Sequence, residues 1–198
     1  MRSVFRLVLA VALVLGLGLL SCTSTTDGDG DGDGTGEEGT IEWARNLADP
    51  VGENWDADAF ICFTQGFELD DDGILRGPDT LLAGDSDYWL FWYTLGDETI
   101  FIVFVSNDGF TIGYEAEDTV VHYELPRYSN GAVKDLMNTA ADEFDENLGD
   151  GDYMYRLSLT ANETVNLALV EGLEVGGELI VGWILFDADT GQILDTSW

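Results

Sequence analysis

Few side chains in this sequence have the chemistry of a nucleophile or a general base. The 198 residues contain one histidine, His122, and two cysteines, Cys22 and Cys62. A serine or cysteine nucleophile usually needs a neighbouring base. His122 alternates with apolar residues in Val120–Tyr123, which predicts a strand whose imidazole is hydrogen bonded or at the surface. Cys62 lies in the apolar run Ala59–Phe63, which predicts a buried, inert thiol. We therefore expect no catalytic residues and no enzyme activity.

Carboxylates are abundant, and one run of them has the spacing of a cation-binding loop. Asp27, Asp29, Asp31 and Asp33 alternate with glycine, and calcium takes oxygen ligands at alternate positions of a loop. An EF-hand loop also needs a closing bidentate Glu and flanking helices, and neither occurs here. We favour a solvated linker, keep these four aspartates as the candidate metal ligands, and expect no cofactor.

The N-terminus predicts export and attachment of a lipid. Two arginines precede Leu7–Leu20, an uncharged apolar run that is too short for a mature membrane span and is typical of a signal peptide. Its end, Leu19-Leu20-Ser21-Cys22, resembles the lipobox of bacterial lipoproteins, in which cleavage precedes the cysteine and the thiol is acylated. The resemblance implies a signal peptide at 1–21, a palmitate-type anchor on Cys22, and the outer membrane of the cell envelope, because Thr23 rather than Asp follows. An ordinary secretory signal is the alternative.

The charge of the chain limits its partners. The sequence has 39 acidic and 7 basic side chains and a net charge of −32. Such a surface repels nucleic acid and anionic lipid, so we expect no nucleic-acid partner. Two explanations of the acidity stay open. The surface is adapted to a saline medium, in which case salt raises the melting temperature, or it is simply a soluble acidic surface.

Composition and periodicity divide the chain into segments. Residues 22–40 form an acidic tether rich in glycine and aspartate, 41–125 a first lobe, 126–131 a hinge and 132–198 a second lobe. The spacing of apolar residues predicts helices at Ile41–Ala48 and Ala132–Leu148. The run Tyr88–Val105 predicts two antiparallel strands that are apolar on both faces, and we expect them to be buried between the lobes. Further strands are predicted near 59–69, 74–76, 110–116, 119–125, 153–159, 165–170, 179–186 and 192–196.

A helix followed by antiparallel strands thus occurs twice, and this layout resembles the tandem PepSY-like domains of exported bacterial lipoproteins. The matching pieces are Trp55–Ala59 leading into a strand, the aromatic strand Tyr88–Tyr93, the helix from Ala132, and the ending Phe186–Leu194. The resemblance implies an α+β fold of two helix-plus-antiparallel-sheet lobes, with the sheets covered on both faces. It also implies a role in peptidase inhibition or an accessory role at the cell surface, without catalytic residues.

The combined expectation is a non-enzymatic lipoprotein that acts as an interaction or peptidase-inhibitor-like module. It would contact the membrane through the lipid on Cys22 and a protein or peptide at a sheet face or edge. The alternative is a structural or calcium-binding acidic envelope protein.

Overall fold

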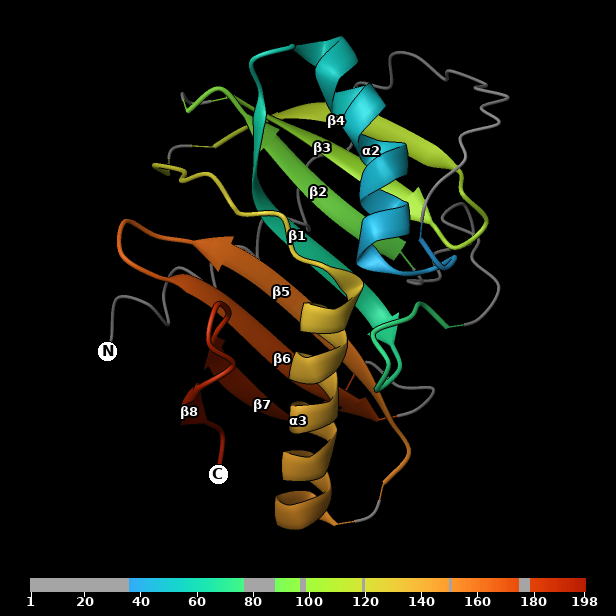
Figure 1. The fold of residues 1–198 in the computed structure, drawn as a ribbon, viewed down its shortest axis with the longest axis vertical. Helices are drawn as coiled ribbons and strands as arrows, with labels where there is room; N and C mark the ends of the chain where they lie inside the picture. The colour runs from blue at the N-terminus through green and yellow to red at the C-terminus, as the bar shows by residue number, and fades with distance from the viewer. Residues whose placement is uncertain (1–35, 77–87, 97–98, 119, 150, 175–178) are drawn as a thin grey trace.

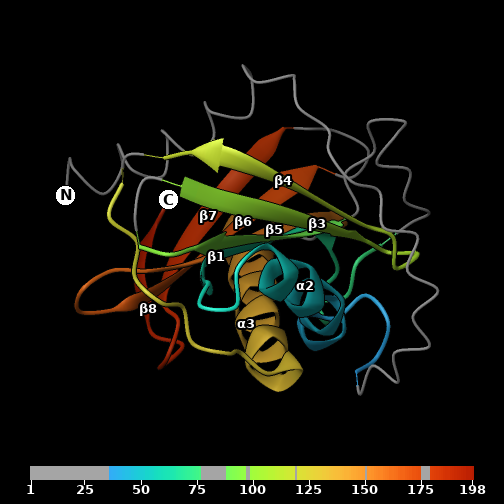
Figure 2. The same cartoon turned by 90° about the horizontal axis from the view of Figure 1, so that it is seen from above.

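In the part of the chain that the structure describes, eight antiparallel strands form one continuous sheet, and two helices lie on one of its faces (Figures 1 and 2). The computed structural model describes residues 36–76, 88–96, 99–118, 120–149, 151–174 and 179–198. Cys22 and the aspartates at 27, 29, 31 and 33 lie outside the described residues. Lipidation and calcium binding therefore stay predictions.

The order of elements repeats once, as a helix followed by four strands. The first half contains α2 (Ile41–Trp55), β1 (Phe60–Leu69), β2 (Tyr88–Thr94), β3 (Thr99–Ser106) and β4 (Thr111–Glu117). The second half contains α3 (Asn130–Leu148), β5 (Tyr153–Ala161), β6 (Asn166–Glu174), β7 (Ile180–Asp187) and β8 (Ile193–Thr196). The strands lie in the order β4-β3-β2-β1-β5-β6-β7-β8, so β1 and β5 join the halves in the middle of the sheet.

The predicted fold of two separate helix-plus-sheet lobes is wrong. β1 pairs with β2 along one edge and with β5 along the other, where its partners run from Phe63↔Thr160 to Leu69↔Tyr155. The backbone groups on a free strand edge need partners, and the pairing of β1 with β5 supplies them to both halves. A duplicated pattern shows how many elements a chain has, but it does not show which strand edges meet.

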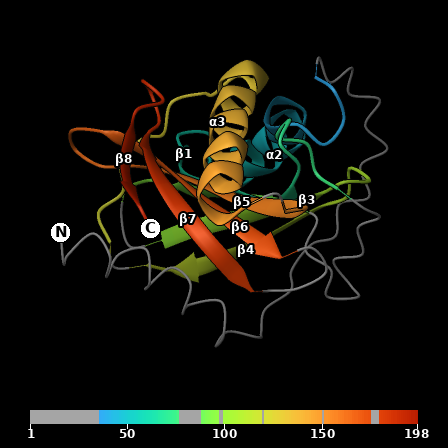
Figure 3. The same ribbon diagram turned by 90° about the horizontal axis from the view of Figure 1, so that it is seen from below.

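Both helices cover the same face of the sheet, as Figure 3 shows from the other end of the molecule. We expected the second lobe to cover the other face of the tryptophan-rich strands, whereas the second half lies beside them in the same sheet. The predicted alternation within β2 is confirmed. Trp89 and Phe91 belong to the cluster under the helices, and Leu90 and Trp92 belong to a cluster on the opposite face.

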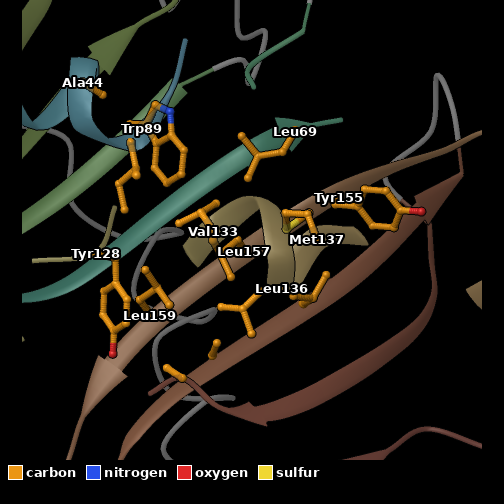
Figure 4. Close-up of a cluster of buried hydrophobic side chains, with 14 of the residues drawn as sticks. Ala44, Leu69, Trp89, Tyr128, Val133, Leu136, Met137, Tyr155, Leu157 and Leu159 are labelled. Atoms are coloured by element: carbon orange, nitrogen blue, oxygen red, sulfur yellow. The ribbon is translucent and has the colours of Figure 1, made fainter. Parts of the chain in front are cut away.

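The larger core lies between the helices and the sheet. Val133, Leu136 and Met137 of α3 pack above Leu157 and Leu159 of β5 (Figure 4). This apolar stripe of α3 was predicted from its spacing, and the structure confirms the helix with two added residues at its start. The hydroxyl oxygen of Ser129 accepts a hydrogen bond from the N–H of Ala132, which caps the helix at its N-terminus.

The prediction that the first helix ends near Ala48 is wrong, because α2 continues through Pro50 to Trp55. Proline inside a helix costs about 3 kcal/mol, and packing of the last turns offsets that cost. Gly52 lies against the ring of Tyr93, where an added Cβ would be 2.5 Å from Cε1. One turn later, the indole of Trp55 stacks on Phe101 with ring centroids 5.3 Å apart. Contacts between distant residues thus hold the helix past its proline.

Two further predicted strands are not strands of the sheet. Residues 120–125 have no strand assignment, although the N–H of Leu125 donates to the carbonyl of Ile61 at 2.7 Å. The stretch 74–76 makes one isolated bridge, between Leu69 and Leu75. A short apolar run becomes a strand only where a neighbouring edge is free along its length.

The two tryptophans of β2 differ in hydrogen bonding, so we expect their replacement to change protein stability by different amounts. The indole nitrogen of Trp89 donates to the carbonyl of Gly39 at 2.8 Å, whereas the buried indole nitrogen of Trp92 has no partner among the described residues. An unsatisfied buried donor costs about 1–3 kcal/mol. We therefore expect Trp92→Phe to lower the free energy of unfolding by about 1–2 kcal/mol less than Trp89→Phe does. Urea denaturation of the two variants measures this, and equal losses would contradict the assignment.

Candidate interaction surface

Cys62 and His122 are the cysteine and the histidine that the structure describes. Cys62 is buried as predicted, and its Sγ lies 3.4 Å from the carbonyl oxygen of Trp92. Burial, with a smaller contribution from Asp118, raises the pKa of the Cys62 thiol to about 12. A thiol with that pKa is protonated at neutral pH and is a poor nucleophile. The imidazole Nε2 of His122 lies 3.3 Å from a carboxylate oxygen of Asp118, in a segment that is not the predicted strand.

Among the residues that the structure describes, no three His, Cys, Asp or Glu side chains are placed to hold a metal ion. In that part of the chain no helix is long and apolar enough to cross a membrane. The feature that stands out instead is exposed apolar surface at one end of the second half.

This surface forms where the end of α3 meets the start of β7. Leu148, Val181 and Trp198 are exposed to 42%, 37% and 41%. The buried ring of Phe144 contacts the ring of Trp198 edge-on at 5.4 Å between centroids and that of Tyr153 at 5.7 Å. We call Leu148, Tyr153, Val181 and Trp198 the α3–β7 surface.

A pair of glycines lets α3 approach the sheet here. Gly172 of β6 and Gly182 of β7 lie opposite one another in the ladder. An added Cβ on Gly172 would lie 2.7 Å from Cε1 of Phe144, and one on Gly182 would lie 3.0 Å from the same atom. The missing side chains make room for the phenyl ring. The aromatic side chains around it are therefore held in place by the sheet itself.

A hollow of about 430 Å³ adjoins this surface and is lined by Gly151, Asp152, Tyr153, Glu174 and Val181. Two of its lining side chains are carboxylates. Asp152 pairs with Arg76 at 3.6 Å, and Glu174 is exposed at the end of β6. The hollow therefore combines apolar side chains with negative charge.

The outer edge of β7 is only partly covered. β8 pairs with Ile184–Phe186, and Ser197 adds hydrogen bonds to the backbone N–H and carbonyl of Trp183. Within the described residues no strand pairs with Ile180, Val181 or Gly182 on that side, and Figure 3 shows β7 extending beyond β8. In the first half, by contrast, β4 pairs with all of Thr99–Val105 on β3.

The basic side chains of the described chain already have acidic partners. The ion pairs are Arg45–Asp49, Arg76–Asp152, Arg127–Asp49, Lys134–Asp72 and Arg156–Glu171. Of these, the Arg156–Glu171 pair is the most enclosed, with Nε 2.6 Å from the carboxylate oxygen. The negative charge at the hollow is thus balanced by one arginine, Arg76, among the described residues.

The sequence indicated parts of this surface but did not bring them together. The helix ending at Leu148 and the predicted strand at 179–186 supply Leu148 and Val181. Leu148 is the last apolar residue of the predicted helix, and the structure exposes it. The spacing of Gly172 and Gly182 was the signal that sequence reasoning missed. Comparison of the chain with models of protein families, with curated proteins and with solved structures finds no match, so the resemblance to PepSY-like domains stays a prediction.

Proposed function

We propose that this protein is a non-enzymatic lipoprotein of the bacterial cell envelope, anchored through Cys22, whose folded part binds another protein. The observation that supports the binding role is the α3–β7 surface. Its exposed apolar side chains lie next to a stretch of β7 whose outer edge pairs with no strand among the described residues. Large apolar side chains that gather on one area of a soluble surface mark an interaction site more often than isolated ones do. The lipobox-like sequence Leu19-Leu20-Ser21-Cys22 supports the proposed lipid anchor. Peptidase inhibition is one form of such binding, and the resemblance to PepSY-like domains suggests it.

The proposal is tested by site-specific photocrosslinking in intact cells that export the full-length protein. A photoreactive phenylalanine analogue replaces Leu148 in one variant and Phe110 in a matched control, since both side chains are 42% exposed and Phe110 follows β3 in the first half. We expect a discrete crosslinked protein from position 148 and none from position 110. No product at 148, or the same product at both positions, would contradict the proposal. Loss of membrane association in Cys22→Ala tests the anchor.

A further inference from the structure

Resting on that proposed function, we propose that the partner binds as an extended strand along the uncovered edge of β7 at Ile180–Gly182, with basic side chains directed at Asp152 and Glu174. A strand that adds to a sheet edge gains affinity from main-chain hydrogen bonds and specificity from its side chains. The α3–β7 surface would receive the apolar side chains of that strand.

In the first half of the protein, the strand equivalent to β7 is covered by its neighbour along nearly its whole edge. β3 and β7 hold equivalent places in the sheet order, each third from the central β1–β5 junction in its own half. β4 covers β3 as far as Thr99, where Glu117 is its partner. β8 stops short, at the level of Ile184, and Ser197 extends the contact to Trp183. The added strand would take the place on β7 that the last residues of β4 take on β3.

The outermost strands differ in how they resist unwanted pairing. Charged side chains on an edge strand are a common protection against added strands. β4 exposes Glu115 and Glu117, and β8 exposes Asp195, whose carboxylate accepts a hydrogen bond from the N–H of Thr196. The uncovered residues of β7 are Ile180, Val181 and Gly182, which carry no charge. This stretch of the described sheet therefore lacks the charged side chains that protect the outermost strands.

The bulge in β7 directs a side chain toward the hollow. The register passes from Gly172↔Gly182 to Leu173↔Ile180, so Val181 is the extra residue. Bulges change the direction of a side chain and often occur next to functional sites. Val181 lines the hollow together with the carboxylates of Asp152 and Glu174. A bound strand with its backbone at Val181 would therefore have side chains within reach of both acids.

The negative charge of the protein indicates which kind of strand would bind at this edge. The chain carries a net charge of −32, and its described lysine and arginine side chains already lie in ion pairs. A second copy on the same edge would bring two sets of Asp152 and Glu174 together, and like charges at an interface oppose association. A segment in which lysine or arginine alternates with apolar residues matches both the acids and the apolar surface.

The test uses the mature lipidated protein in detergent at physiological salt, because salt reduces non-specific attraction of basic peptides to an acidic surface. The probe is a six-residue peptide of alternating lysine and valine. A peptide with the same lysines but proline in place of each valine is the control, since proline cannot donate to a ladder. Backbone amide shifts and hydrogen exchange locate the bound peptide.

We expect the lysine–valine peptide to protect amides within Ile180–Gly182 and to bind at least tenfold more tightly than the proline peptide. The N–H of Trp183 already donates to Ser197 and is not a reporter. Asp152→Asn combined with Glu174→Gln should weaken binding about threefold to tenfold, as the loss of two exposed ion pairs implies. The matched variant Glu117→Gln on β4 should leave it unchanged. Equal binding of the two peptides, protection on β4, or equal weakening by Glu117→Gln would overturn the inference.

Two further results separate this inference from the proposed function. If Leu148 crosslinks to a partner while that partner leaves the β7 amides unprotected, the strand-addition inference is wrong and the interaction role stands. If sedimentation shows a dimer that Val181→Lys abolishes, the occupant is a second copy and the inference is wrong. If Leu148 crosslinks to nothing, the interaction role itself is lost.

Discussion

Replacement of Phe144 by alanine should lower the free energy of unfolding by about 3–5 kcal/mol, the usual cost of truncating a buried phenylalanine. The side chain is completely buried, and its ring meets the rings of Tyr153, Tyr155 and Trp198 at centroid distances between 5.4 and 5.8 Å. Gly172 and Gly182 line the same space and have no side chain that could fill the cavity. Urea denaturation followed by far-ultraviolet circular dichroism measures the loss.

Leu148 supplies the control for this prediction on the same helix. It lies four residues after Phe144 and is 42% exposed, so its truncation removes less buried area. We expect Leu148→Ala to cost less than about 1 kcal/mol, because partly exposed side chains contribute little to burial. Similar losses for the two variants would contradict the packing described for the end of α3.

The spacing of apolar residues predicted helices and strands well where residues a few positions apart determine the structure. The stripe of α3, with Val133 and Met137 at its centre, could be read from the sequence because one face of a helix meets one core. The two apolar faces of β2 were equally visible, since Trp89 and Leu90 alternate within a run that has no polar side. Both predictions depend on residues a few positions apart.

Features that depend on distant residues could not be predicted. The junction of β1 with β5 depends on backbone groups almost 100 positions apart, such as those of Phe63 and Thr160. Proline disfavours the interior of a helix, so local propensity opposes the continuation of α2 through Pro50. The contacts of α2 with β2 and β3 offset that cost. A resemblance between two halves of a sequence is equally consistent with two sheets and with one sheet. The second edge of β1 decides between them, because it pairs with β5.

The candidate surface was hidden from the sequence for a related reason. The run at 179–186 correctly predicted an apolar strand, but the sequence does not show that β8 covers only part of it. Whether Val181 lies in a core or at the surface depends on how far the neighbouring strand extends. The aspartate at 152 and the glutamate at 174 are two among 39 acidic side chains, and only the fold places them around one hollow.

Replacement of Leu157 by alanine tests whether the two halves form one cooperative unit. Leu157 lies on β5, is completely buried, and is the ladder partner of Gly66 on β1. The substitution should lower the free energy of unfolding by about 2–5 kcal/mol. Leu194→Ala on β8, at a side chain that is 47% exposed, is the control and should cost less than about 1 kcal/mol.

The distribution of that loss distinguishes one sheet from two lobes. Because β1 and β5 are paired, loosening β5 removes hydrogen-bond partners from the first half as well as the second. Native-state hydrogen exchange should then show the slowest amides of β2 and β6 losing protection by the same free energy, as expected when one global unfolding reaction exposes both. If β6 lost protection while β2 kept it, the halves would unfold independently, and the β1–β5 pairing would not couple them.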